Sequence, residues 1–493
     1  MEKIIRIHEM DNVAVATQGV AAGETVTVGQ VQLTAAQEIP AGHKIALRRI
    51  AEGENIIKYG FPIGHAKRDI EAGEWVHTHN TASNLSGLNE YSYQPVECPQ
   101  AAETPATFMG YVRPDGSVGI RNEVWIIPTV GCVNGVAEAI EDIVNAGRPA
   151  DAPRAFAYTH PYGCSQLGGD LVMTQKALCG LIRHPNAAGV LVLGLGCENN
   201  QTEDMIRELG DYDPERVRFL ICQQVEDEIA EGTRIVRELL EAAGKCTRQP
   251  VPASKLIVGL KCGGSDGFSG ITANPLLGAF AEKLAAQGGS VMLTEVPEMF
   301  GAETILMNRC EDKALFEKTV ALINDFKSYF MRYGEKINEN PSPGNKKGGI
   351  TTLEEKSLGC VQKGGRAMVR DVLKYGEPVK KQGLSLLQAP GNDLVAATAL
   401  AISGAQIVLF TTGRGTPFGC PVPTAKISTQ DEIAARKANW IDFNAGPLLA
   451  GVPMAEETQA FFDYVLKVAS GEATKSEKLS KRNLAIFKDG VTL

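Results

Sequence analysis

The chain has 493 residues, of which 44% are hydrophobic and 22% charged, a composition typical of folded proteins with more than one domain. Its 58 acidic and 49 basic residues give a net charge of −9, which argues against a nucleic-acid or anionic-membrane partner. No apolar run reaches the roughly 20 residues that span a bilayer, and the N-terminus lacks the apolar core of a signal peptide. We therefore expect a cytoplasmic protein whose 11 cysteines are reduced thiols.

Residues 1–85 repeat a short unit, in which a glycine is followed three residues later by a β-branched residue. Copies of the unit begin at Gly23, Gly42, Gly53 and Gly73. Turn glycines in front of short β-rich runs predict a small, mostly β domain with tight turns. The proline-containing stretch at residues 86–105 predicts a linker.

After the linker, short apolar runs alternate with stretches of helical spacing. The run from Val124 to Ile127 is typical of a buried strand. Further strands are predicted at residues 190–193, 217–221, 256–260, 290–293 and 406–410, and helices at residues 202–209 and 225–243. This alternation predicts mostly parallel sheets covered by helices, as in Rossmann- and flavodoxin-like folds. We place one α/β domain at residues 106–250 and a second at residues 251–493.

Ligands bind at the carboxyl ends of the strands in open α/β sheets, so the residues after each predicted strand form the candidate site. Cysteines stand at five of these strand ends, at Cys132, Cys164, Cys197, Cys222 and Cys262. A single cysteine is usually a small buried hydrophobic residue. Five at equivalent positions, together with His160 and Glu198, favour a functional site.

Glycine-rich loops add polar groups to the strand ends. The loop at residues 261–267 combines glycines with Ser265 and Asp266 and suits a small polyhydroxy anion, with a plain turn as the alternative. The loop at residues 341–349 holds Asn345 and Lys346, with a flexible surface connection as the alternative. Arg414 lies between two glycines, and its planar guanidinium can bind a carboxylate through two hydrogen bonds.

The segment GEWVHTHN places His77 and His79 one residue apart in a chain with only 7 histidines. If residues 75–79 form a strand, both imidazoles point to the same face and can chelate a metal ion. Neutral imidazole suits iron, manganese or zinc. The alternative is the polar face of an ordinary edge strand.

Six of these segments together resemble the altronate/galactarate dehydratase family, and the likeness runs through the full length of the chain. The segments are His77–Asn80, Tyr162–Cys164, Gly194–Glu198, Cys262–Asp266, Asn340–Asn345 and Thr412–Pro417. The resemblance implies an N-terminal β-clip domain of the SAF type, followed by two α/β domains. It also implies a hydro-lyase that uses divalent iron or manganese to convert a sugar acid into a 2-keto-3-deoxy acid. Cys420 departs from the expected pattern and receives no role.

The resemblance further implies a substrate, D-altronate, which is dehydrated to 2-dehydro-3-deoxy-D-gluconate in hexuronate breakdown. A related sugar acid such as galactarate is the alternative substrate, and a non-catalytic sugar-acid-binding protein is the alternative function. The sugar acid is the expected small-molecule partner. The sequence leaves the oligomeric state open, a homo-oligomer included.

Dehydration of a sugar acid removes the proton next to the carboxylate, and the resulting carbanion needs positive charge close by. We expect His77 and His79 to bind the metal and His160 and Glu198 to act as acid and base. The residues expected to hold substrate oxygens are Ser265, Asp266, Asn345, Lys346 and Arg414. His160 could instead cap a strand end, and Glu198 a helix start. The alternative cofactor is an iron–sulfur cluster with one open iron, bound by Cys132, Cys164, Cys197 and Cys262.

Overall fold

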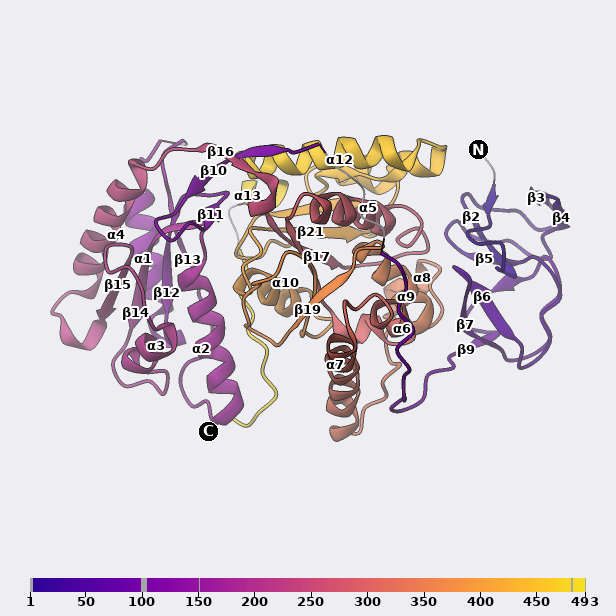
Figure 1. Ribbon diagram of the computed structural model, residues 1–493, viewed down its shortest axis with the longest axis horizontal. Coiled ribbons are helices and arrows are strands. Elements are labelled where there is room, and N and C mark those ends of the chain that lie inside the picture. The colour runs from indigo at the N-terminus through magenta and orange to yellow at the C-terminus, as the bar shows by residue number, and fades with distance from the viewer. Residues whose placement is uncertain (1–2, 99–103, 150, 480–481, 493) are drawn as a thin grey trace.

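The computed structural model describes residues 3–98, 104–149, 151–479 and 482–492. These residues form three domains in a row, with the C-terminal (third) domain between the N-terminal and second domains (Figure 1). The predicted fold, a small β domain and two α/β domains with parallel sheets, is confirmed. The boundaries near residues 85, 105 and 250 stay predictions. Part of the predicted linker, residues 99–103, lies outside the described residues.

The N-terminal domain consists of short antiparallel strands in three small sheets, with the orders β1-β2-β5-β8, β3-β4 and β6-β7-β9. The strands are β1 (Ile4–Ile5), β2 (Val13–Ala16), β3 (Thr25–Val28), β4 (Val31–Thr34), β5 (Lys44–Ala46), β6 (Asn55–Lys58), β7 (Phe61–Ala66), β8 (Trp75–Val76) and β9 (Thr81–Ala82).

The repeated glycines of this domain are turn residues. All four have a positive φ, between 77° and 87°. In each copy the residue after the glycine donates its backbone N–H to the carbonyl three residues earlier, and a strand begins one residue later. This is the pattern of a β-turn whose third position requires the left-handed conformation that glycine adopts without strain. The repeat is therefore a turn signal rather than a ligand motif.

The second domain has a parallel sheet of order β13-β12-β14-β15, and a small antiparallel sheet of order β11-β10-β16 closes one side. The strands are β10 (Thr107–Val112), β11 (Val118–Gly119), β12 (Glu123–Pro128), β13 (Ala155–Ala157), β14 (Ala187–Gly194), β15 (Val217–Ile221) and β16 (Gln249–Pro252). The helices are α1 (Asn134–Asn145), α2 (Gly168–Arg183), α3 (Thr202–Leu209) and α4 (Glu228–Gly244). Side chains of β12 alternate between two cores, because Val124 and Ile126 pack with α1 and α4 whereas Trp125 and Ile127 pack with α2.

The third domain is built on a seven-stranded parallel sheet of order β19-β20-β18-β17-β21-β22-β23. The strands are β17 (Ile257–Cys262), β18 (Ser290–Leu293), β19 (Val369–Leu373), β20 (Gly383–Leu387), β21 (Ile407–Thr412), β22 (Thr424–Ser428) and β23 (Phe443–Asn444). The helices are α5 (Ala273–Ala286), α6 (Glu303–Met307), α7 (Lys313–Arg332), α8 (Pro343–Lys347), α9 (Leu353–Cys360), α10 (Asp393–Ile402), α11 (Asp431–Arg436), α12 (Met454–Ala469) and α13 (Lys475–Lys478).

A buried ion-pair network joins the N-terminal and third domains. Lys44 and Lys58 both donate to the carboxylate of Glu355 in α9, at 2.8 Å, and all three side chains are at most 1% exposed. One hydrophobic core also continues across this junction, from Ile56 and Val76 to Leu353. The N-terminal domain is thus fixed on the side of the third domain where α8 and α9 lie (Figure 1).

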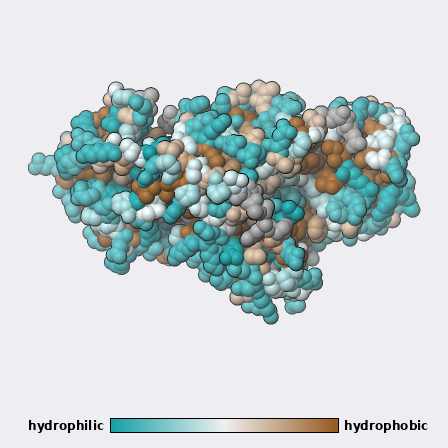
Figure 2. Space-filling view, turned by 45° about the horizontal axis from the view of Figure 1, so that its top comes forward, coloured by the Kyte–Doolittle hydropathy of each residue, from teal (hydrophilic) through white to brown (hydrophobic). Residues whose placement is uncertain are grey.

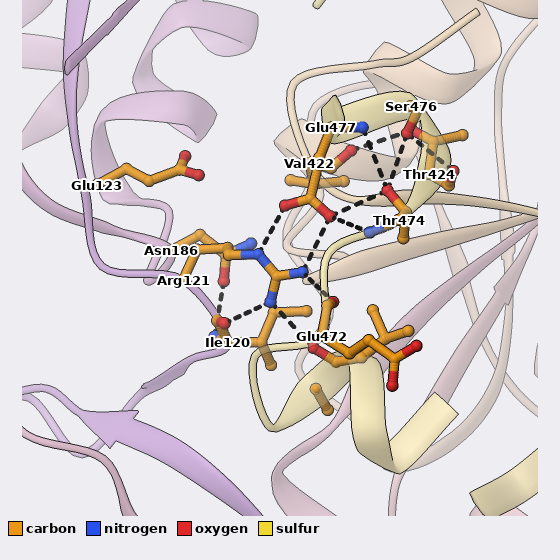
Figure 3. A network of polar contacts seen from close by, with 12 residues as sticks. Ile120, Arg121, Glu123, Asn186, Val422, Thr424, Glu472, Thr474, Ser476 and Glu477 are labelled. Atoms are coloured by element: carbon orange, nitrogen blue, oxygen red, sulfur yellow. Dashed lines mark hydrogen bonds and ion pairs between the residues drawn. The ribbon is translucent and has the colours of Figure 1, made fainter. Parts of the chain in front are cut away.

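A second polar junction joins the second and third domains (Figure 3). The Arg121 guanidinium donates to both carboxylate oxygens of Glu477 in α13, at 2.7 and 2.9 Å. It also donates to the Val468 carbonyl at the end of α12, at 2.9 Å. This bidentate geometry orients α13 against the start of the second-domain sheet.

The surface seen in Figure 2 is hydrophilic over most of its area, with hydrophobic residues in scattered patches. Within the part of the chain that the structure describes, no helix is long and apolar enough to cross a membrane.

Candidate active site

A cavity of about 590 Å³ opens at the carboxyl edge of the third-domain sheet. It is lined by residues that follow β17, β18 and β20 and by the segment around α8 and α9. The lining residues include Cys262, Gly263, Gly264, Glu298, Asn340, Asn345, Lys356, Asn392 and Asp393. Strand β17 lies between β18 and β21, so the strand order reverses there. Open α/β sheets bind ligands at such a reversal, which makes this cavity the candidate site.

Two thiols and a carboxylate meet beside the cavity, and two of these groups, Cys262 and Glu298, line it. The sulfur atoms of Cys262, the last residue of β17, and Cys360, the last residue of α9, lie 3.4 Å apart. Each thiol also lies 3.0 Å from a carboxylate oxygen of Glu298, which follows β18. All three side chains are buried, and their ligand atoms lie within 4.8 Å of one another. This cluster has the donor atoms and the spacing to hold a metal ion.

Lysine side chains compensate the negative charge of this cluster. Lys356 forms an ion pair with Glu298 at 2.8 Å, and Lys363 is buried nearby. Burial alone would raise the pKa of Glu298, but these two ammonium groups bring the pKa below its usual range. The hydrogen bond with Cys360 lowers the pKa of the Cys262 thiol to about 6, against the effect of burial. The site therefore favours a carboxylate and one thiolate at neutral pH.

A second ionic group lies behind Cys262. Glu295 accepts hydrogen bonds from the Lys261 ammonium and from the backbone N–H of Cys262, the latter at 3.1 Å. Burial, reinforced by the charge of Glu298, raises the pKa of Glu295 to about 8. Glu295 has a φ of 69°, a left-handed conformation that costs a bulky residue roughly 1–3 kcal/mol. Lys261 also pairs with Asp393 at 2.8 Å, and Asp393 reaches the cavity.

Four of the predicted substrate-binding residues lie at the edge of the sheet where this cluster is found. The Ser265 hydroxyl donates to the Cys262 sulfur at 3.5 Å, and the Asn345 amide donates to the Ser265 carbonyl at 2.8 Å. Arg414 is exposed, and its side-chain stem covers Gly264, where an added Cβ would lie 3.0 Å from the Arg414 Cβ. Lys346 is half-buried in α8, next to Asn345. The structure thus brings these residues to one edge of one sheet.

Asp266, also predicted to bind substrate, belongs to the same loop but has other partners. Its carboxylate accepts hydrogen bonds from Ser269 and Thr429, at 3.1 and 3.0 Å. Burial raises its pKa despite these bonds. The carboxylate therefore ties the loop after β17 to the end of β22, and a role in substrate binding stays a prediction.

The paired histidines do not lie on one face of a strand. Strand β8 ends at Val76, and residues 77–80 form a turn in which the Asn80 side chain accepts the backbone N–H of His77 at 2.9 Å. The prediction of a strand through residue 79 is therefore wrong. His77 stacks on Trp75 with ring centroids 5.1 Å apart, whereas His79 is exposed and tilted against the same indole.

His77 nevertheless keeps features of a ligand. Burial, reinforced by the Lys44 ammonium, lowers its pKa to about 4, so the imidazole is neutral. Its Nδ1 atom is buried and has no hydrogen-bond partner among the described residues. Its neighbour His43 lies 3.3 Å from the Lys347 carbonyl at the end of α8. The histidine pair is therefore close to the segment that lines the cavity, and its metal role stays a prediction.

The predicted acid and base lie in the second domain instead. His160 Nε2 lies 2.8 Å from the Pro128 carbonyl, and Nδ1 accepts the Tyr162 N–H at 3.2 Å. Burial lowers the pKa of His160 to about 4, so both nitrogens of a neutral ring are engaged. Glu198 accepts from the Thr129 hydroxyl at 2.5 Å and from two backbone N–H groups of its own loop. The His160 contacts are those of the strand-capping alternative. The Glu198 carboxylate binds the end of its own strand rather than the first turn of α3, so its contacts are not those of a helix cap.

The four cysteines of the alternative cluster divide between the two sheets. Cys132, Cys164 and Cys197 follow strands of the second-domain sheet and are exposed, whereas Cys262 is buried in the third domain. The structure does not bring all four together.

Sequence reasoning missed several residues of the cluster. Glu295 and Glu298 follow the strand predicted at residues 290–293, so the strand-end rule pointed to them. Cys360, Lys356 and Lys363 lie on or just after α9, which no predicted strand precedes. No local pattern in the sequence marks them.

The domains and the cavity define a multidomain α/β protein with a buried thiol–carboxylate centre. Family profiles match all three parts: the altronate/galactarate dehydratase SAF domain at residues 2–84, the D-galactarate dehydratase/altronate hydrolase second domain at residues 110–244, and the D-galactarate/altronate dehydratase C-terminal domain at residues 253–492. The chain belongs to the altronate/galactarate dehydratase family and is a hydro-lyase.

Curated relatives are similar along the whole chain. The altronate dehydratase of Bacillus subtilis (strain 168) is 54% identical over 499 residues, covering 100% of both chains. The altronate dehydratase of Escherichia coli (strain K12) is 53% identical over 494 residues, covering 99% of both. The galactarate dehydratase (L-threo-forming) of Escherichia coli (strain K12) is 34% identical over 98% of this chain and 96% of its own length.

Proposed function

We propose that this protein dehydrates D-altronate to 2-dehydro-3-deoxy-D-gluconate in a metal-dependent reaction at the cavity beside Cys262. The proposal is carried by the full-length identity of 53–54% to two altronate dehydratases, against 34% to a galactarate dehydratase. The reduced thiols fit the predicted cytosolic location. Galactarate remains the alternative substrate.

The proposed metal ligands are Cys262, Glu298 and Cys360, whose ligand atoms lie within 4.8 Å of one another. The two cysteine sulfurs are soft donors, and together with one carboxylate they suit iron better than manganese, so ferrous ion is the proposed metal. When bound, the ion would act as a Lewis acid toward a substrate oxygen. Metal binding by His77 and His79 is kept as the alternative.

The chain's own groups have the following proposed roles. Arg414 and Lys356 bind the substrate carboxylate and stabilise the negative charge that develops when the neighbouring carbon loses its proton. The Asp393 carboxylate, which is 40% exposed, accepts that proton. The side chains of Ser265, Asn345 and Lys346 orient hydroxyl groups. His160 and Glu198 are not carried into this centre, because their polar atoms are engaged in the second domain.

The test is an anaerobic assay for 2-keto-acid formation from a panel of hexonates and hexarates, before and after chelation. We expect D-altronate to give the highest kcat/KM, chelation to abolish turnover, and ferrous ion to restore it better than manganous ion. Full activity in a metal-free preparation would contradict the metal centre. A higher kcat/KM for galactarate would contradict the substrate, and tight binding of altronate without turnover would favour the sugar-acid-binding alternative.

A further inference from the structure

We propose that the second domain holds a separate iron–sulfur cluster, bound by Cys132, Cys164 and Cys197. These three residues follow three neighbouring strands, in the order β13-β12-β14. Strand β12 comes first in the chain and lies between β13 and β14, so the strand order reverses there. A ligand site is expected at this reversal, and each of the loops that meet there presents one thiol.

Backbone hydrogen bonds next to the cysteines join the three loops. Gly131, which precedes Cys132, donates its N–H to the Tyr162 carbonyl at 2.9 Å. On the other side of Cys164, the Ser165 N–H donates to the Asn199 side chain at 2.7 Å. The Asn200 N–H donates to the Gly163 carbonyl at 2.9 Å, which links the Cys164 and Cys197 loops again. The thiols are thus carried on one connected edge.

Exposure separates these three cysteines from the others at strand ends. All three are exposed, although unpaired cysteine is among the most often buried residue types. Cys222 follows the neighbouring strand β15, but burial raises its pKa to about 11, so it stays protonated. Gln166, beside the Cys164 loop, has a buried amide nitrogen without a hydrogen-bond partner among the described residues. Such a donor matches the sulfide acceptors of a cluster.

The spacing of the three thiols is too wide for a single tetrahedral ion and is compatible with a cluster. The three sulfur atoms do not all lie within 4.8 Å of one another, unlike the Cys262, Glu298 and Cys360 group. A tetrahedral ion with metal–sulfur bonds of about 2.3 Å needs its ligands closer than that. A [4Fe–4S] cube binds each cysteine at a different iron, so its cysteine sulfurs stand farther apart. Three thiolates would leave one iron without a protein sulfur.

The experiment is anaerobic reconstitution of the full-length chain with ferrous iron and sulfide, followed by removal of unbound metal. We expect visible sulfide-to-iron absorption and about four iron atoms and four labile sulfides per chain. Cys132→Ser, Cys164→Ser and Cys197→Ser should each reduce the labile sulfide at least about fivefold. The melting temperature measured before reconstitution should be the same in these variants as in wild type, because exposed side chains contribute little to packing.

Two variants serve as controls. Cys246→Ser changes another exposed thiol of the second domain and should keep the full cluster content. Cys262→Ser changes the proposed altronate centre and should also keep it, which separates this proposal from the proposed function. Absence of labile sulfide in the reconstituted wild type would overturn the proposal, and so would iron bound without sulfide. A chromophore that survives all three changes, or that Cys262→Ser removes, would do the same.

Discussion

The second and third domains carry the same kind of parallel sheet with cysteines at its carboxyl edge, but the two edges differ in burial and charge. Cys262 is buried next to Glu298 and Lys356, whereas Cys132, Cys164 and Cys197 are exposed. Burial without compensation would raise the pKa of a thiol and keep it protonated. At Cys262 the hydrogen bond with Cys360, helped by the nearby lysines, opposes that effect. The position at a strand end therefore determines where a site can form, and the burial and charge of its surroundings determine which chemistry it can support.

The largest loss of kcat/KM is expected from changing Cys262, the buried thiol at the edge of the third-domain sheet. Cys262→Ser should lower kcat/KM for D-altronate about a thousandfold, because it removes a soft ligand from the proposed metal centre. The matched control is Cys310→Ser, a buried thiol of the same domain that contacts Thr319. Both variants are compared by steady-state kinetics with ferrous ion present. Equal losses of kcat/KM in the two variants would indicate that replacing any buried thiol of this domain by a hydroxyl lowers the activity.

A smaller loss of kcat/KM is expected from changing Arg414, the exposed arginine at the same edge of the third-domain sheet. Arg414→Lys should lower kcat/KM about a hundredfold, because a point charge cannot reproduce two parallel hydrogen bonds to a carboxylate. The fold should be unaffected, since Arg414 is exposed. Arg436→Lys, which changes an exposed arginine of α11, is the control. Near-normal kinetics for Arg414→Lys would remove this residue from the site.

The histidine pair should have a smaller effect than Arg414, with a larger share from the half-buried His77 than from the exposed His79. His77→Ala should lower kcat/KM about thirtyfold, within the range seen for groups next to a metal. The reason is that its neutral imidazole has a buried nitrogen near α8 with no hydrogen-bond partner in the part of the chain that the structure describes. His79→Ala should lower it less, because that ring is exposed. The comparison requires kinetics on both altronate and galactarate. Unchanged turnover in both variants would leave the pair as a surface feature of the turn.

The smallest effect is expected at the junction that holds the two sheets together. Glu477→Gln removes the carboxylate that Arg121 binds, and it should lower the free energy of unfolding by about 2 kcal/mol at pH 7 without changing kcat. Although burial opposes it, Arg121 lowers the pKa of Glu477 in the folded state. The carboxylate therefore stabilises the fold above the unfolded pKa of about 4.3, and this contribution is lost as pH falls through the folded pKa.

Urea unfolding of wild type and Glu477→Gln across this pH range tests the prediction. The two proteins should differ most at neutral pH and converge in acid. A difference in the free energy of unfolding that grows as the pH falls would contradict the prediction.

Much of the fold was predictable because buried parallel strands are continuous apolar runs. The strand predicted at residues 290–293 is β18, and the helix predicted at residues 202–209 is α3, with the same bounds. The helix predicted at residue 225 begins at Glu228, because the Asp227 side chain caps it through the Ala230 N–H. Strand ends likewise pointed to Cys262 and Ser265, since topology alone places them.

The rest of the site depends on contacts that sequence spacing does not contain. Residues 77–80 turn instead of continuing the strand, because one Asn80 side chain binds the His77 backbone. Cys360 meets Cys262 across 98 positions of the chain, through the packing of a helix against a strand end. The engagement of His160 by two backbone groups is equally invisible in the residue pattern.

The continuous core between the N-terminal and third domains has a consequence for unfolding cooperativity. Detaching the N-terminal domain would expose Leu353 and Ile56 to water and leave Glu355 without its two lysines. Each of these steps carries a free-energy cost comparable to the stability of a small domain. Differential scanning calorimetry should therefore show the two domains melting in one transition, with no earlier peak for the N-terminal strands.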